Sequence, residues 1–165
     1  MRLHPRWLFL LLLALAAGYI IATADRLPQQ VASHFGANNL PDAAMTRDFY
    51  RAYMLGFTVV FPLAIVGAIG WLPRLFPRHV NLPNRDYWLA PEQREQTLAD
   101  LRALACWLGC MIVLFMAGIH FVILVANASV PPALPANLFI GIGLSFVALL
   151  ALWIVILNRH FRRPA

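Results

Sequence analysis

The chain has 165 residues, enough for one domain, of which 61% are apolar and only 12% are charged. Soluble domains carry about twice that share of charged residues, so this much apolar surface must face lipid. The formal net charge of +6 comes from arginines at the ends of the apolar runs. These arginines form no single stripe of the kind that binds a nucleic acid, so we expect membrane lipid and no nucleic-acid partner.

Four apolar runs approach the length of about 20 residues that a helix needs to cross the hydrocarbon core. They place the crossings at about 7–24, 52–72, 103–126 and 138–157, with an external segment at 25–51 and a cytoplasmic loop at 73–102. The predicted fold is all-α: one integral membrane domain, a four-helix transmembrane bundle with a short amphipathic external segment and an ordered cytoplasmic loop.

The first run also has features of a signal peptide. Arg2 and Arg6 precede it, and Ala22–Ala24 offers a small-x-small cleavage site. The run is longer than the usual apolar region of about 7–15 residues, so we expect a retained anchor, with cleavage as the alternative.

Arginine counts indicate the orientation of the chain. Ten of the 13 arginines lie near the two termini or in the segment 73–102, whereas three lie in the segment 25–51. Because positive residues are retained on the cytoplasmic side, we expect a multi-pass protein of the bacterial inner (plasma) membrane with both termini in the cytoplasm.

Apolar residues in the external segment recur at every fourth position, at Leu27, Val31 and Phe35. This spacing predicts a short amphipathic helix that lies on the membrane surface. Gly36 and the asparagines at 38–39 tolerate positive φ, so a turn is expected after that helix.

His34 and Asp42 are the titratable pair of this segment. A hydrogen bond between them across the turn would fold the segment back on itself. The alternative is that they form a metal or ligand site together with Asp48. Two or three dispersed ligands are only weak evidence for a metal site. We favour the structural hydrogen bond and expect no bound metal and no cofactor.

Small residues recur at four-residue spacing in three of the runs, which lets helices approach closely in lipid. They are Ala14, Gly18 and Ala22 in the first run, Cys106, Cys110 and Gly118 in the third, and Gly141 and Ser145 in the fourth. Packing within one bundle and a homo-oligomer interface both fit these stripes. The cysteines are interpreted as packing residues, because two thiolates do not complete a metal site. Pro62 removes a backbone donor in the middle of the second run and predicts a kink.

The cytoplasmic loop is rich in proline, asparagine and aromatic residues, which argues for an ordered segment. At its centre stand Asn84, Arg85, Asp86, Tyr87 and Trp88. We favour a connector at the membrane surface over the alternative, a docking surface for a cytoplasmic regulatory protein. The run 90–92 resembles a helix start, with proline in the first turn, and predicts a helix that continues into the third crossing.

His120 is the only ionisable residue deep within a predicted crossing. A neutral histidine bonded to a neighbour on its own helix is the simpler interpretation. The alternative is a proton-sensitive or ligand-sensing element that couples the external segment to the bundle, because ionisable residues inside membranes are often functional.

The external segment resembles that of a known bacterial group, the membrane immunity proteins that protect against the sporulation-delaying toxin. The matching residues are Leu27, Pro28, Val31, His34 and Phe35, followed by Pro41 and Asp42. The resemblance covers about the first third of the chain, and Asn39 stands where the family more often has glycine. The stretch 84–92 is similar to small uncharacterised members of the same broad group. The resemblance implies a multi-pass protein of toxin-immunity or signal-receiving type, although its best-known relatives have crossings that this chain lacks.

We therefore expect a non-enzymatic membrane protein that binds an extracellular or periplasmic ligand or toxin, and a protein partner inside. The residues expected to bind the ligand are His34, Phe35, Asp42 and His120, and those expected to bind the partner are Asn84 to Trp88. A transport or permeation accessory subunit is one alternative, with a polar path along His120, Thr58, Ser145 and the cysteines. A metal-dependent membrane enzyme is the other, and we expect no catalytic residues because the chain has no nucleophile–base pair or paired carboxylates at usable spacing.

Overall fold

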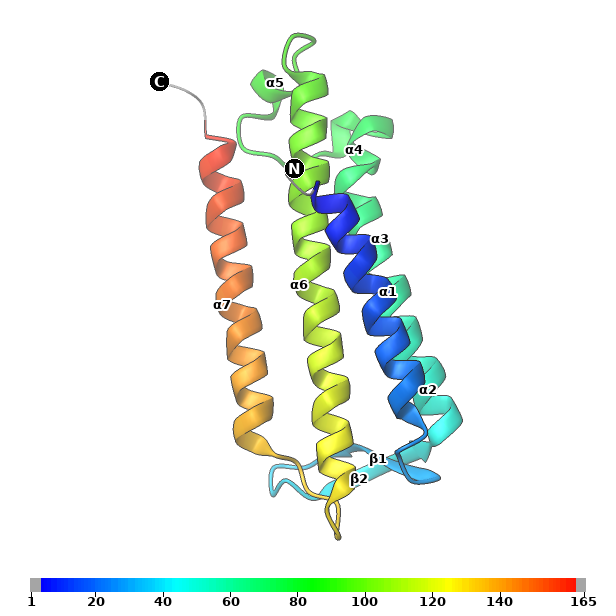
Figure 1. The fold of residues 1–165 in the computed structure, drawn as a ribbon. Coiled ribbons are helices and arrows are strands. Elements are labelled where there is room, and N and C mark those ends of the chain that lie inside the picture. The colour runs from blue at the N-terminus through cyan, green and yellow to red at the C-terminus, as the bar shows by residue number, and fades with distance from the viewer. Residues whose placement is uncertain (1–3, 163–165) are drawn as a thin grey trace.

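The computed structural model describes residues 4–162 and shows four long helices, each antiparallel to the one that precedes it in the chain (Figure 1). They are α1 (Pro5–Ala24), the continuous helical segment Arg47–Leu75, α6 (Arg94–Ala128) and α7 (Ala136–His160). Each is long and apolar enough to cross a membrane, which confirms the predicted bundle.

The second crossing is made of several helical pieces. α2 (Arg47–Leu55) leads into a π-helical turn (Gly56–Val60), which is followed by α3 (Phe61–Gly70) and α4 (Leu72–Leu75). The π-helical turn ends two residues before Pro62, whose nitrogen has no hydrogen to donate to the preceding turn. The irregularity predicted at this proline therefore takes the form of a wider helical turn, one of the known responses to a break in the hydrogen-bond ladder.

The two ends of the bundle are built differently. Residues at both described ends of the chain, α4 and α5 (Arg85–Trp88) lie at what we call the terminal end (Figure 1). The strands β1 (Gln30–Phe35) and β2 (Pro41–Thr46) and the connection 129–135 lie at the opposite end, the hairpin end. The prediction that both termini share a side with the loop 73–102 agrees with this arrangement.

Charge is also divided unequally between these ends. The hairpin end holds as many aspartates as arginines: Asp25, Asp42 and Asp48 with Arg26, Arg47 and Arg51. Among residues 4–162, the terminal end holds eight arginines and four acidic residues. The positive excess of the described chain therefore lies entirely at the terminal end.

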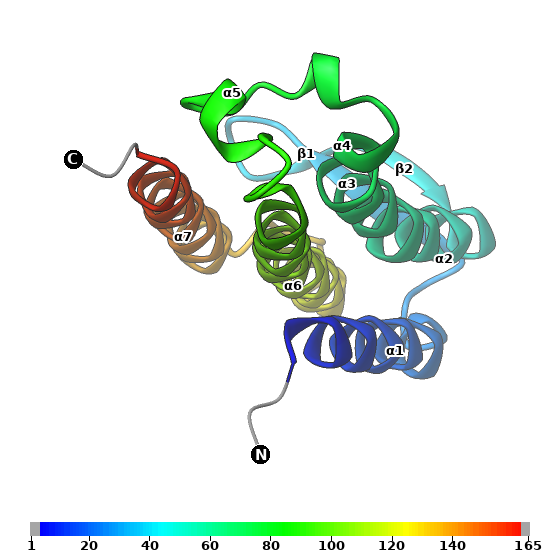
Figure 2. The same ribbon diagram turned by 90° about the horizontal axis from the view of Figure 1, so that it is seen from above.

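α6 is the central helix of the bundle (Figure 2). It packs against α1, against α3 and against α7, and residues of the first two helices meet it in a common core. That core contains Phe9, Ala16, Val66, Ala105, Cys106, Cys110 and Val113. Both cysteines are buried there, as expected of packing residues. No residue of α7 is buried, so α7 touches the bundle along one side only.

The small-residue stripes do not all mark packing faces. Gly18 and Gly141 have no atom within 4 Å of the position a Cβ would take, and both are exposed. The stripe of the first crossing therefore faces outward, whereas Gly141 and Ser145 of the fourth crossing line an open groove between α6 and α7. Of the two interpretations of these stripes, close packing within the bundle does not hold at Gly18 or Gly141. On α1 the buried face is instead carried by residues such as Phe9 and Ile20.

The external segment is a β-hairpin, so the predicted amphipathic helix is wrong. β1 and β2 pair antiparallel, with an irregularity between Ala32 and His34. A spacing of four residues is compatible with one face of a helix and also, being even, with one face of a strand. The turn was predicted correctly: Asn39 has φ of 61° and closes a tight connection with Gly36.

Candidate functional site

The hairpin is held against the bundle by a side chain that imitates a neighbouring strand. The amide of Asn127, near the end of α6, accepts a hydrogen bond from the backbone N–H of Ala32 (2.9 Å) and donates one to the Ala32 carbonyl (2.9 Å). The turn is also fixed, because the Leu134 N–H donates to the Asn39 carbonyl. Together these contacts tie the hairpin to α6 and to the connection that follows it.

Beneath the hairpin lies an apolar cluster to which it contributes directly. Leu27 and Val31 are buried there beside Ile20 of α1, Met54 of α2 and Ile123 of α6. Val31 is fully buried. The hairpin is therefore part of the core rather than an appendage, and its position depends on the three helices below it.

His120 lies within this region and is also fully buried. Its Nε2 atom lies 2.8 Å from the hydroxyl of Thr23 on α1, and its Nδ1 atom lies 2.9 Å from the hydroxyl of Tyr50 on α2. The Tyr50 ring stacks on the imidazole, while the Tyr19 ring meets it edge-on. The prediction of a partner on its own helix is therefore wrong, because His120 joins three crossings.

The directions of these hydrogen bonds can be assigned. The Thr23 hydroxyl donates its only hydrogen to the Tyr19 carbonyl at 2.6 Å. It must therefore accept from His120, which places the imidazole hydrogen on Nε2 and leaves Nδ1 to accept from the Tyr50 hydroxyl. The result is a one-way chain of hydrogen bonds in which every donor and acceptor of a neutral imidazole is satisfied.

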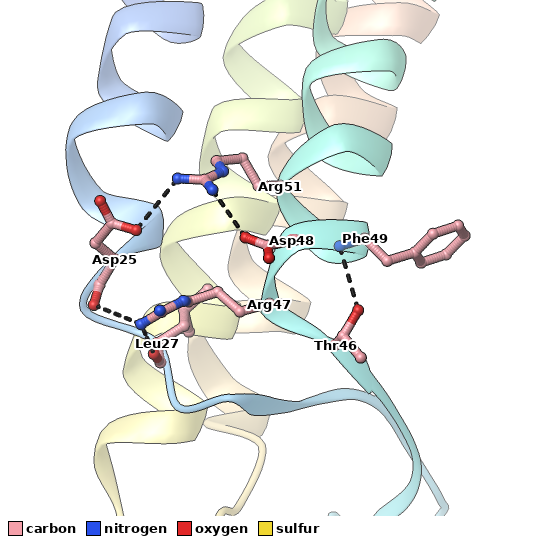
Figure 3. A network of polar contacts seen from close by, with 7 residues as sticks. All are labelled: Asp25, Leu27, Thr46, Arg47, Asp48, Phe49 and Arg51. Carbon is pink, nitrogen blue, oxygen red and sulfur yellow. Dashed lines mark hydrogen bonds and ion pairs between the residues drawn. The ribbon is translucent and has the colours of Figure 1, made fainter.

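A second polar network joins α1 and α2 at the surface (Figure 3). Arg51 contacts the carboxylates of Asp25 (3.2 Å) and Asp48 (2.8 Å), while Arg47 donates to the carbonyls of Asp25 and Leu27. The arginines thus face the carbonyl end of α1, and Asp48 lies in the first turn of α2, so both charges complement the helix dipoles. The network closes the gap between the two helices directly beside the hairpin.

Of the predicted ligand-binding residues, His34 and Asp42 form the expected pair across the hairpin, with His34 Nδ1 2.5 Å from an Asp42 oxygen. Both side chains are exposed, at 72% and 52%, whereas Phe35 leans against the apolar cluster. Asp48 does not join them, since it pairs with Arg51. Across residues 4–162, no three histidine, cysteine or acidic side chains gather closely enough to hold a metal ion.

At the terminal end the loop binds the end of α7. The Trp88 indole N–H donates to the Phe161 carbonyl at 2.8 Å, and the Asn84 amide donates to the same oxygen. The Thr97 hydroxyl of α6 in turn donates to the Trp88 carbonyl. Of the predicted partner-binding residues, Asn84 and Trp88 therefore make contacts within the chain itself. Arg85, Asp86 and Tyr87 lie beside them, and Arg85 and Asp86 are exposed. α6 begins at Arg94, slightly later than the run 90–92 indicated.

The polar residues proposed for a transport path lie in different surroundings. Thr58 is fully buried in the π-helical turn, whereas Ser145 is exposed on α7 and bonds to its own helix at Gly141. The cysteines are packed among apolar side chains.

Thr23, Tyr50 and Asn127 belong to the site but could not be predicted from the sequence. Each is separated from its partner by 70 to 97 positions. The only signal in the sequence was that a histidine buried in lipid must find hydrogen-bond partners.

Residues 11–60 match the model of a family described as a domain of unknown function (DUF1648), a domain found in membrane proteins. The matched segment takes in most of α1, the hairpin, α2 and the π-helical turn. It therefore contains Thr23 and Tyr50, while His120 lies outside it. No curated protein and no solved structure matches the chain.

Proposed function

We propose that this multi-pass membrane protein is of the immunity or signal-receiving type and that its hairpin meets a ligand or toxin outside the cell. The contact surface is centred on the exposed pair His34 and Asp42. The proposal draws on the resemblance of this segment to membrane immunity proteins that protect against the sporulation-delaying toxin.

One observation carries the proposal: the hydrogen-bonded chain through His120 lies beneath the hairpin and connects three crossings. Tyr50 belongs both to that chain and to the apolar cluster that contains Val31 of the hairpin. A ligand that displaces the hairpin therefore also displaces Tyr50, and the change reaches α1 and α6 through His120.

The proposed orientation puts the hairpin end outside and the terminal end in the cytoplasm of the bacterial inner membrane. It is supported by the excess of arginine at the terminal end, as the positive-inside rule requires. In this orientation, a cytoplasmic regulatory partner would meet Arg85 and Asp86, because Trp88 is occupied by Phe161.

The experiment is protection of a sensitive bacterium against the sporulation-delaying toxin. Cells that express the wild-type chain should survive, and His34→Ala should abolish survival at equal membrane abundance. The matched control is His79→Ala, which removes an exposed histidine at the terminal end and should leave protection intact. Wild-type cells that die like the empty-vector control, or survival unchanged by His34→Ala, would refute the proposal.

A further inference from the structure

The outer face of α2 and α3, together with the free edge of β2, has no role in the function proposed above. We propose that this face joins two copies of the chain side by side in the membrane, related by a twofold axis along the membrane normal. Three features of the face support this occupant, and each is independent of the ligand contact at His34.

The first feature is the unpaired edge of β2. Asn127 binds both backbone groups of Ala32, so these groups point away from β2. Ala44 is the residue opposite Ala32. In an antiparallel pair, residues facing each other without mutual hydrogen bonds direct their backbone groups to the two outer edges. The N–H and carbonyl of Ala44 therefore face outward, away from α6, and Ala44 is exposed.

The second feature is a ridge beside a groove on the adjoining helices. Four exposed aromatic rings follow one another along α2, the π-helical turn and the start of α3: Phe49, Tyr53, Phe57 and Phe61. Three of these rings, Tyr53, Phe57 and Phe61, are also walls of a wholly apolar groove of about 510 Å³. The small residues Ala52, Gly56 and Ala64 line the same groove. Figure 3 shows that Phe49 points away from α1, on the side opposite to Arg51.

A ridge next to a groove is self-complementary under twofold symmetry, since each copy presents its ridge to the groove of the other. Small residues that line the groove allow the close approach that associates helices in lipid. The four rings are 42–60% exposed. At about 200 Å² for a whole aromatic side chain, they offer roughly 400 Å² per copy, and two copies offer roughly 800 Å². The exposed Val60 adds to this area, which approaches the roughly 1,000 Å² of a specific interface.

The third feature is the direction of the strand. β2 runs across the end of the bundle, roughly perpendicular to the helices (Figure 1). A strand that lies in the membrane plane becomes antiparallel to its copy when the twofold axis is the membrane normal. The free edges of two β2 strands can therefore pair around Ala44, and two hairpins become one four-stranded sheet.

Cysteine cross-linking in native membranes tests the strand pairing. The starting protein is Cys106→Ala, Cys110→Ala. Facing residues in a hydrogen-bonded pair have Cα atoms about 5.5 Å apart, within the range of a disulfide. Ala44→Cys should therefore give an oxidant-dependent band of twice the chain mass. Ala128→Cys, an exposed position at the same end of the bundle on α6, should not. Absence of the disulfide-linked dimer in Ala44→Cys, or cross-linking to a polypeptide of a different mass, would overturn the proposal.

A matched pair of glycine substitutions tests the helix packing. Gly56 and Gly141 both have no atom within 4 Å of the position a Cβ would take, so a larger side chain fits at either site in a single copy. Gly56→Leu fills the groove and should reduce the dimer fraction at least tenfold, measured by mass in lipid nanodiscs. Gly141→Leu should leave it unchanged. A wild-type chain that is monomeric in nanodiscs would contradict the proposal, because lipid would then cover the outer face. Equal dimer fractions in Gly56→Leu and Gly141→Leu would also contradict it.

Discussion

α6 and α7 show that equally apolar helices can have opposite places in a membrane protein. Both are long enough to span, yet α6 has buried residues along its length and α7 has none. Burial, rather than the presence of polar contacts, distinguishes them. On α6, the fully buried His120 bonds to two other crossings. On α7, the polar side chains that reach α6 are partly exposed: the Trp153 indole donates to the Leu104 carbonyl, and His160 Nε2 lies 2.9 Å from an Asp100 oxygen. Hydropathy therefore determines that a helix crosses, and the burial of its side chains shows whether it lies inside the bundle.

The largest difference between the two helices is expected when one methyl group is added to each of them. A Cβ at Gly109 of α6 would lie 2.6 Å from Val66 Cγ2 and 2.7 Å from Phe9 Cε2, whereas one at Gly141 of α7 meets open space. Gly109→Ala should lower the free energy of unfolding by about 1–3 kcal/mol, because overpacking forces neighbours apart. Gly141→Ala should not lower it, since alanine favours helix. Denaturation in SDS measures both, and equal midpoints would contradict the assignment of α6 as the central helix.

A smaller effect is expected from removing one hydrogen bond to α6. Tyr50→Phe leaves Nδ1 of the buried His120 without a donor, which should cost about 1 kcal/mol of unfolding free energy. Tyr53→Phe is the control, because that side chain lies on the same helix but is 45% exposed. The SDS midpoint of Tyr50→Phe should therefore be lower than that of Tyr53→Phe. A Tyr50→Phe midpoint equal to wild type would show that the imidazole finds another partner.

The smallest effect concerns the attachment of α7 at the terminal end. Trp88→Phe keeps an aromatic ring against Phe161 but removes the indole donor, which should cost about 0.5–1 kcal/mol locally. The end of α7 should then open more often, and trypsin should cut faster after Arg159. Trp107→Phe, an exposed tryptophan on α6, is the control and should leave the cleavage rate unchanged. Slower or unaltered cleavage in Trp88→Phe would mean that Asn84 alone holds the Phe161 carbonyl.

The sequence was sufficient for the crossings, for the shared side of the termini and the central loop, and for the turn around Asn39. These features depend on local properties: run length, arginine position and tolerance of positive φ. It was not sufficient for the hairpin, because the spacing of Val31 and Phe35 fits a strand as well as a helix. The partners of His120 could not be predicted either, since Thr23 and Tyr50 belong to other crossings and only the folded bundle brings them together.

The unequal charge of the two ends has an energetic consequence during insertion. A membrane potential of 100 mV, negative inside, does work of about 2.3 kcal/mol on each elementary charge carried across. The hairpin end has three arginines against three aspartates, so its passage outward is electrically neutral. Export of the terminal end would move four excess positive charges of the described chain against the potential, at about 9 kcal/mol per 100 mV. A membrane potential would therefore favour the insertion topology that keeps the terminal end on the negative side.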